Sequence, residues 1–343
     1  MNVRPRLLVL LLATVLLAAL AGIAIVRAAD RASERDRARP GEPAAHSGVV
    51  TLHQSGRLLF RNLAWGPQRD HVSSVPLTTT AGPRTSTPRT SAPRDCLRFH
   101  AAAGTAICLR TTGGVVPRHE AVLLDAELRP VRTFQVSGIP TRARVSPSGR
   151  LAAWTVFVSG DSYAGGAFST RTAIYDTRTG SLQPDLEKFT VLKDGHRHRA
   201  ADHNFWGVTF AADDNRFYAT LATGGHTYLV EGDLARRTLR TLRENVECPS
   251  LSPDGTRIAF KKRVPGAPAD TPWRLYVLDL RTARETGLAE HRSVDDEALW
   301  LDSRTLLYAL PGDFGADLWS VPADGSDTPR LTVKSGTSPA VVP

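Results

Sequence analysis

The chain lacks the short motifs by which many enzymes are recognised. No Gly-x-Ser-x-Gly nucleophile elbow occurs, and the nearest segment, residues 160–165, is one residue too long and rich in glycine. No glycine-rich phosphate loop follows a strand and opens a helix. The acidic runs at 213–214 and 295–297 suit turns better than the carboxylate pair of a glycosidase. We therefore assign no catalytic residue and expect neither enzymatic activity nor a cofactor.

Cysteine is scarce, with three residues in 343. Cys96 and Cys108 lie on the two arms of an expected hairpin centred near Ala102. If residue 96 opposes residue 108, the two side chains share a face, and a disulfide is geometrically reasonable and contributes about 2–3 kcal/mol. Disulfides persist in oxidising compartments, so this bridge predicts export, whereas two buried free thiols would suit a cytosolic protein. We expect the remaining Cys248 to be a buried apolar residue.

Lysine is also scarce, since it accounts for five of the 43 basic residues, and the formal net charge is +9. A nucleic-acid-binding surface needs basic residues clustered on a folded face with aromatic residues between them. Much of the basic charge lies instead in two segments of biased composition. We expect residues 29–46 to be a flexible tether and residues 78–94 to be a disordered Thr/Pro/Arg loop. These patterns exclude nucleic acid as the partner.

Only one long apolar run occurs, the uncharged residues 7–26, with Arg4 and Arg6 before it. Twenty helical residues match the ~30 Å hydrocarbon core of a bilayer, whereas a secretory signal usually has only ~7–15 apolar residues. We expect residues 1–28 to be a signal anchor, and a signal peptide cleaved before Ala29 is the alternative. Five arginines between residues 27 and 39 oppose export of the following chain, but the expected disulfide favours it.

The sequence does contain a repeated β unit, which is clearest from Leu251 to Phe260. In its Ser-Pro-Asp-Gly turn, proline pre-sets φ, aspartate caps the backbone and glycine accepts a positive φ. The residues that follow alternate, so that Ile258 and Phe260 share one face as in a half-buried strand. A further strand, Trp273 to Leu280, completes the unit, and its Asp279 opens the next turn.

Related copies begin near residues 57, 96, 145, 208 and 298. The turn anchors Ser146, Ala211, Ser252 and Leu301 are separated by 65, 41 and 49 residues. Repeats of ~40–50 residues with four strands each are typical of propeller blades. We therefore predict an all-β fold, a six-bladed β-propeller over residues 47–343, with a β-sandwich or an open array of hairpins as the alternatives. The C-terminal strand, residues 337–342, is predicted to close the ring by pairing with the N-terminal blade.

The pattern Ser-Pro-Asp-Gly-x-x-Ile-Ala-Phe at 252–260, with Leu-Tyr-Val-Leu-Asp at 275–279, resembles the repeats of TolB-like proteins. Residues 317–325, which lead to Arg-Leu-Thr at 330–332, resemble them as well. The resemblance implies a non-enzymatic, extracytoplasmic propeller that binds other envelope proteins and takes part in translocation. TolB itself carries an α/β domain before its propeller, whereas fewer than fifty residues precede the first blade here, so the specific Tol–Pal role is not carried over.

The densest polar cluster spans residues 194–203. Imidazole and carboxylate groups are ligands for zinc and other divalent metals. However, Arg197 and Arg199 alternate with these groups, and their spacing matches no closed zinc motif. We therefore assign no metal site and expect a solvated loop that joins blades three and four. The weak candidate ligands are His196, His198, Asp202 and His203.

Five of the six tryptophans fall at strand positions, where we expect them to pack between blades. Trp65 lies in a loop and is the candidate for an exposed contact. We predict a monomer, membrane-anchored or secreted, whose loops at one mouth bind an envelope protein or peptide. The alternative is a hydrolase or glycan-binding module that acts on cell-wall material at the channel. Convergent acids or histidines at the mouth would favour that alternative, and a rim without them would favour binding.

Overall fold

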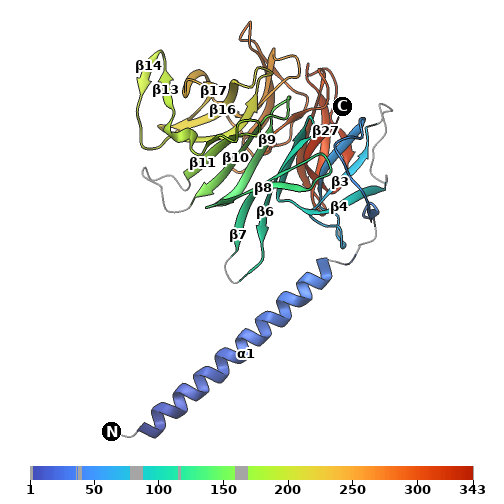
Figure 1. Ribbon diagram of the computed structural model, residues 1–343, viewed down its shortest axis with the longest axis vertical. Coiled ribbons are helices and arrows are strands. Elements are labelled where there is room, and N and C mark those ends of the chain that lie inside the picture. Colours follow the sequence, from blue (N-terminus) through green and yellow to red (C-terminus); the bar gives the residue numbers. More distant parts are fainter. Residues whose placement is uncertain are drawn as a thin grey trace.

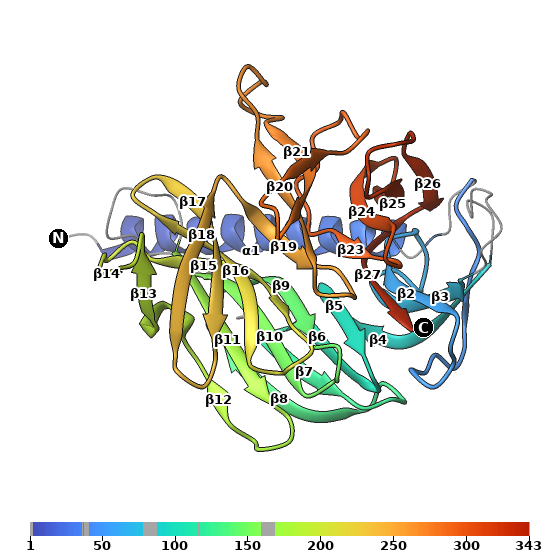
Figure 2. The same cartoon turned by 90° about the horizontal axis from the view of Figure 1, so that it is seen from above.

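The chain folds into a six-bladed β-propeller preceded by one helix (Figure 1). The computed structural model describes residues 3–35, 37, 41–77, 88–114, 117–158 and 169–342. Seen from above, the six sheets surround a central channel (Figure 2). The predicted fold class is therefore confirmed, and the sandwich alternative is wrong.

Each blade is one antiparallel meander whose first strand lies next to the channel. The first blade also receives the last strand of the chain and an additional outer strand. From the channel outward, it consists of β27 (Gly336–Val342), β2 (Arg57–Asn62), β3 (His71–Pro76), β4 (Arg89–Asp95) and β1 (Ala45–Ser47). The second consists of β5 (Arg98–Ala102), β6 (Thr105–Thr112), β7 (Arg118–Leu124) and β8 (Pro130–Val136). The third consists of β9 (Ile139–Val145), β10 (Leu151–Val158), β11 (Ser169–Asp176) and β12 (Leu182–Gln183).

The fourth blade is extended at its outer edge by a hairpin, and the last two blades have four strands each. The fourth consists of β15 (Asn204–Phe210), β16 (Arg216–Thr223), β17 (His226–Asp233), β18 (Thr238–Glu244), β13 (Thr190–Lys193) and β14 (His196–His198). The fifth consists of β19 (Glu247–Leu251), β20 (Arg257–Arg263), β21 (Trp273–Asp279) and β22 (Glu285–Gly287). The sixth consists of β23 (Leu299–Trp300), β24 (Thr305–Gly312), β25 (Gly315–Pro322) and β26 (Arg330–Val333). A short 3-10 helix, η1 (Leu186–Lys188), precedes β13.

The ring closes where β27 pairs with β2, as the sequence predicted. The two strands are antiparallel, with Leu59 opposite Ala340 and Leu58 opposite Val341. Leu58, Leu59 and Ala340 have no exposed surface. The pairing covers the edges that both ends of the sheet would otherwise present to solvent.

The turns between the first two strands of the blades have the chemistry that the repeats imply. In the fifth blade the Ser252 hydroxyl accepts the N–H of Arg257 at 3.0 Å, and in the third blade Ser146 does the same for Leu151. Gly149 has φ +77°, and a Cβ there would lie 2.8 Å from the carbonyl oxygen of Ala103. Glycine therefore allows this turn to pack against the neighbouring blade.

Apolar side chains from facing sheets form the core between blades. One cluster joins Ile107 and Leu109 of the second blade to Trp154 and Tyr175 of the third. Trp300 of the sixth blade is 6 % exposed, and its indole N–H donates to the carbonyl oxygen of Ser250 in the fifth at 2.9 Å. These two tryptophans occupy the inter-blade positions expected of them.

Three boundaries differ from those expected. Helix α1 (Val3–Arg35) continues through the first part of the expected tether, and β1 occupies its end. Residues 89–94 of the expected loop belong to β4, because the side chain of Arg89 is 1 % exposed and donates hydrogen bonds to buried acceptors. Residues 78–87 lie outside the described residues. His196–His198 form β14 rather than a loop, since they pair with β13. Within α1, Val9–Arg31 is long and apolar enough to cross a membrane. The propeller does not bury this segment.

Candidate functional site

A cavity of about 880 Å³ occupies one mouth of the channel. It is bounded by the first residues of the inner strands β9, β15 and β19 and by the connections from the second to the third strand of blades four and five. A second, smaller pocket of about 30 Å³ shares Arg98, Thr141 and Arg142 with this cavity. In its wall Arg98 pairs with Asp296 at 3.3 Å and Arg144 pairs with Glu297 at 2.9 Å. Ion pairs thus lie directly beside the larger cavity.

The cavity wall carries both signs of charge. Among the described residues that line it, five are cationic and five are carboxylic acids, namely Arg98, Arg142, Arg171, Lys261 and Arg263, and Asp185, Glu187, Asp202, Glu247 and Asp295. His203, His226, Trp206 and Trp273 also line the cavity.

The basic side of the cavity is built on β20. Lys261 is 3 % exposed, pairs with Asp295, and has Glu247 at 3.8 Å. Its Nζ lies 4.2 Å from the centre of the Trp273 ring, and the guanidinium of Arg263 lies 4.3 Å from the same ring centre. Burial raises the pKa of Glu247, whereas Lys261 lowers the pKa of Asp295 although burial opposes it. The ring and the two acids thus hold the buried ammonium group in place.

The acidic side lies between blades three and four. Glu187 accepts the hydroxyl of Thr170 at 3.0 Å and the N–H of Thr172 at 3.2 Å. Burial, together with a hydrogen bond to Asp185, raises the pKa of Glu187 well above its usual value. Hydrogen bonds from Glu187 and Lys188 lower the pKa of Asp185, although burial opposes them. The neutral form of Glu187 is therefore favoured beside the ionised form of Asp185.

The structure brings only part of the weak metal set together. Asp202 and His203 line the cavity, but Asp202 accepts the Thr223 hydroxyl at 2.8 Å and the Gly224 N–H at 2.6 Å. The rings of His198 and His203 are 5.2 Å apart, and burial lowers the pKa of His203. His196 is exposed on β14. Within the described ranges, no group of three or more His, Cys, Asp or Glu residues could hold a metal ion.

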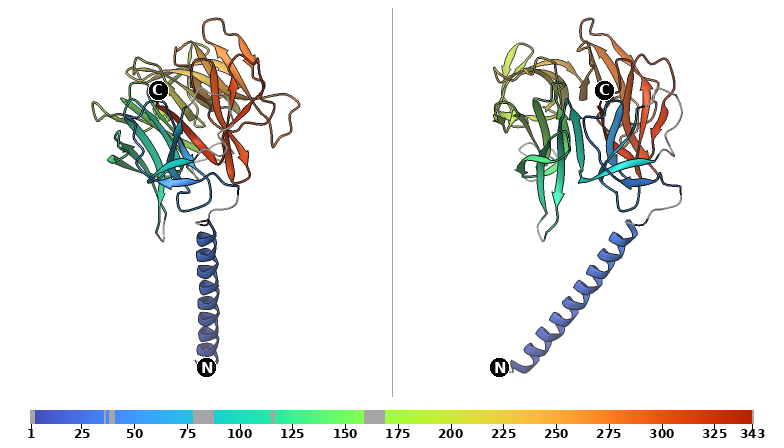
Figure 3. Two further views of the ribbon diagram at one scale, coloured as in Figure 1. Left: turned by 90° about the vertical axis from the view of Figure 1, so that its right-hand side faces the viewer. Right: turned by 45° about the vertical axis from the view of Figure 1, so that its right-hand side comes forward.

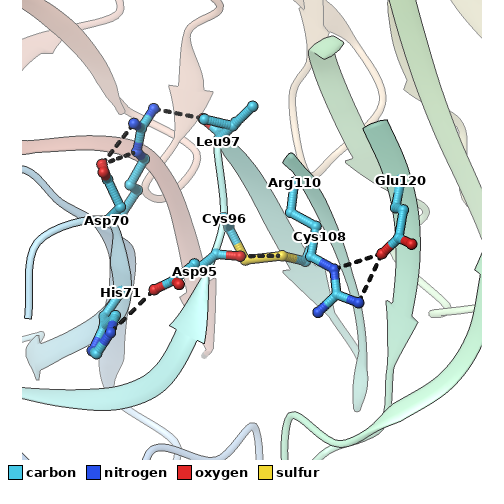
Figure 4. Close-up of a disulfide and its surroundings, with 9 residues drawn as sticks. Asp70, His71, Asp95, Cys96, Leu97, Cys108, Arg110 and Glu120 are labelled. Carbon is cyan, nitrogen blue, oxygen red and sulfur yellow. Dashed lines mark hydrogen bonds and ion pairs between the residues drawn. A yellow bond between two sulfur atoms is a disulfide. The ribbon is translucent and has the colours of Figure 1, made fainter. Parts of the chain in front are cut away.

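Cys96 and Cys108 form the disulfide, but in a different register from the one expected (Figure 4). Phe99 rather than Cys96 lies opposite Cys108, and Cys96 follows the end of β4. The bridge therefore joins the segment that leaves blade one to β6 of blade two. Beside it, His71 pairs with Asp95 at 3.1 Å. Cys248 is 1 % exposed and free, which confirms its expected burial.

Trp65, the candidate for an exposed contact, is half-buried. Its backbone N–H donates to Oε1 of Glu42 at 3.4 Å, and the Arg69 guanidinium lies 5.7 Å from its ring centre.

Sequence reasoning missed Glu187, Lys261 and Trp273 as cavity residues. Three consecutive cations at 261–263, which end a strand with alternating apolar residues, were the available signal for the basic side.

The chain matches no protein-family model and no curated protein sequence. Among solved structures it is similar to TolB from Acinetobacter baumannii, with a TM-score of 0.56, 17% identity, and coverage of 83% of this chain and 66% of that one. It is also similar to a chain of a nidogen/laminin complex, with a TM-score of 0.54, 11% identity, and coverage of 83% and 97%. A puromycin-hydrolyzing peptidase from Mycobacterium tuberculosis gives a TM-score of 0.49 at 12% identity, with coverage of 80% and 43%. At these identities the likeness shows the propeller fold and nothing finer.

Proposed function

We propose that this protein is a membrane-anchored, extracytoplasmic propeller of the TolB-like type that acts as a non-enzymatic scaffold. It binds a peptide segment of an envelope protein at one mouth of its channel, and a part in translocation across the envelope is the role that the resemblance of its repeats suggests. The observation that carries the proposal is the cavity of about 880 Å³ with five cationic and five acidic side chains. Its size lies within the usual ~300–1,000 Å³ of ligand sites. A peptide with both signs of charge matches such a wall.

Two independent features support the proposed location of the propeller. The Val9–Arg31 segment of α1 is long and apolar enough to span a bilayer. The disulfide between Cys96 and Cys108 suits an oxidising compartment. Together they support an anchored propeller on the outer side of the membrane.

A hydrolase or glycan-binding module is the second candidate, because acids and histidines do converge at the mouth. Asp202 and His203 lie in the wall with His226. However, Glu187 accepts hydrogen bonds from Thr170 and Thr172, and Asp202 accepts them from Thr223 and Gly224. Lys261 is likewise engaged with two acids. Groups held in this way favour recognition of a ligand over proton transfer to it.

Binding of short fluorescent peptides to the full-length protein in detergent micelles tests the proposal. The peptides carry one lysine and one glutamate, two lysines, two glutamates, or neither. We expect the mixed-charge peptide to bind most tightly, and Arg263→Glu to weaken it about tenfold, or ~1.4 kcal/mol. Arg284→Glu makes the same charge change at an exposed position of the same blade, outside the cavity lining, and is expected to leave binding unchanged.

Two outcomes would contradict the proposal. One is that no peptide class binds, and the other is that both arginine variants weaken binding equally. Mass spectrometry of the recovered peptides separates the second candidate, because cleavage products would identify a hydrolase.

A further inference from the structure

The N-terminal segment attaches at the mouth that carries the cavity. Glu42 accepts the Trp65 N–H at 3.4 Å through one oxygen and the Ser335 hydroxyl at 2.9 Å through the other. Trp65 lies between β2 and β3, and Ser335 lies between β26 and the inner strand β27. The corresponding connections of blades four and five bound the cavity, so both features belong to the same end of the ring. Figures 1 and 3 show α1 leaving the propeller at this end.

A buried arginine holds this attachment in place. Arg89 donates to the carbonyl oxygens of Lys334 and Ser335 at 2.8 and 3.1 Å, and to Oδ1 of Asn62 at 2.8 Å. Burial lowers the pKa of Arg89 to about 10, and the negative charge of Glu42 opposes that shift. β1 then runs parallel to β4, with Ala45 opposite Arg89. The chain is thus fixed to the mouth from residue 42 onward.

The length of chain before this attachment is short. The candidate span ends at Arg31, α1 ends at Arg35, and the attachment begins at Glu42. At about 1.5 Å per helical residue and about 3.5 Å per extended residue, the attachment lies within about 30 Å of the bilayer surface. Strands of eight residues make the propeller about 26 Å deep. If the opposite end of the propeller faced the membrane, the chain between Arg31 and Glu42 would have to extend along nearly the whole depth of the propeller to reach the attachment.

The rim beside the cavity combines apolar and charged groups. Ile139 is 63 % exposed and lies opposite Phe157, which is 36 % exposed, at the mouth end of blade three. Acids stand beside the cations of the wall, since Lys261 is paired with Glu247 and Asp295 and Arg98 with Asp296, and these acids oppose the binding of a lipid phosphate. A polypeptide with charged residues next to an apolar stretch, as where a chain enters a bilayer, fits both parts of the rim.

We infer that the cavity mouth faces the membrane that α1 enters, and that its ligand is the mixed-charge segment of a polypeptide where that polypeptide meets the bilayer. The inference rests on the proposed function for the nature of the ligand. It adds the orientation of the propeller and the place where the partner is presented.

Energy transfer from single labels on the full-length protein in vesicles tests the orientation. Ala269→Cys places a dye in the exposed β20–β21 connection at the mouth, and Arg281→Cys places it in the exposed β21–β22 turn at the other end of the same blade. The unlabelled background is the natural sequence, whose free Cys248 is buried. With acceptor dyes on the outer-leaflet lipids, we expect transfer from position 269 to be at least twice that from position 281. Equal transfer, or more from position 281, would overturn the orientation.

The ligand is tested with the mixed-charge peptide, either free or attached to a lipid of the same vesicles. We expect at least tenfold tighter apparent binding of the attached peptide, because the membrane raises its effective concentration at the mouth. A long Gly/Ser insertion after Arg35 is expected to remove this gain and to leave binding of the free peptide unchanged. Equal binding of both forms would overturn presentation at the membrane while leaving the proposed function intact. Displacement of the peptide by phosphatidylglycerol vesicles would identify a lipid headgroup as the occupant instead.

Discussion

The ammonium group of Lys261 lies 4.2 Å from the centre of the Trp273 ring and is paired with Asp295 and Glu247. The adjacent Lys262 has a parallel arrangement, because it pairs with Glu285 and lies 4.1 Å from the ring centre of Tyr276. The two side chains differ in burial, at 3% and 21% exposure. A comparison of substitutions at the two lysines therefore tests how burial changes the stability that is lost when an ion pair is removed.

Replacement of Lys261 by methionine is therefore expected to lower the free energy of unfolding by about 3 kcal/mol, because it leaves Glu247 without its partner in a buried position. Lys262→Met is expected to lower it by less than about 1 kcal/mol, because Lys262 itself is more exposed and its partner Glu285 keeps an ion pair with Arg243. Urea unfolding of the two variants measures both values. Equal losses would show that Lys261 is not held in the way the structure describes.

The carboxyl pair on the other side of the cavity predicts a pH dependence. The pKa of Glu187 is raised above its ordinary value of 4.5, so its neutral form stabilises the fold at low pH, and this contribution is lost as the pH rises through the raised pKa. Glu187→Gln keeps the neutral state at all pH values. We expect the variant to gain stability relative to the natural protein as the pH rises above about 4.5.

Glu120→Gln provides the opposite sign for comparison. Hydrogen bonds from Arg110 and Gln135 lower the pKa of Glu120, so its charged form stabilises the fold above the unfolded pKa, and this stability is lost as the pH falls. The variant is expected to be less stable than the natural protein at neutral pH and to approach it in acid. Denaturant unfolding between pH 4 and 8 measures the free energy of unfolding of both variants and of the natural protein. If the difference between Glu187→Gln and the natural protein did not change with pH, the raised pKa of Glu187 would be contradicted.

The disulfide is expected to contribute about 2–3 kcal/mol, because it closes a short loop in the unfolded chain. The double variant Cys96→Ala/Cys108→Ala should show this loss in thermal or urea unfolding. Alkylation of the denatured natural protein without reductant should modify one thiol, that of Cys248, and reduction should expose two more. Intact mass of protein from the cell envelope also reports whether residues 1–28 are retained. Three alkylated thiols before reduction would remove the disulfide and weaken the case for export.

The sequence predicted the fold well because the blade repeat has local causes. The turn at Ser252 and the alternation that follows it each act within a few residues, and repetition of this unit also revealed the C-terminal strand that pairs with β2. Residues 89–94 were mistaken for loop because the acceptors of the buried Arg89 are distant in sequence, at Asn62 and, about 245 residues away, at Lys334 and Ser335. No composition rule reveals such a partner.

The cavity was not predictable for the same reason. Its charged groups come from blades two, three and five and from the connections that flank blades four and six, where a charged residue is ordinarily solvated. Glu187 adjoins a two-residue strand in a segment without a clear repeat, so nothing in its neighbourhood marks it as a cavity residue. Asp202 was noticed in a polar cluster, but its hydrogen-bond partners on β16 and in the following turn showed its role only in three dimensions.

Ring closure offers the last prediction. Ala340 has no exposed surface and lies opposite Leu59, so Ala340→Asp would place a carboxylate in the contact that joins the two ends of the chain. We expect a loss of about 3–5 kcal/mol in unfolding free energy, since a buried charge without a partner is strongly destabilising. Val131→Asp introduces the same charge at a position that is 63 % exposed on the outer strand β8, and its effect should stay within about 0.5 kcal/mol. Hydrogen exchange should show the loss of protection first in β2 and β27, because those strands share the damaged ladder. If both variants were equally stable, the C-terminal strand would not be what holds the ring closed.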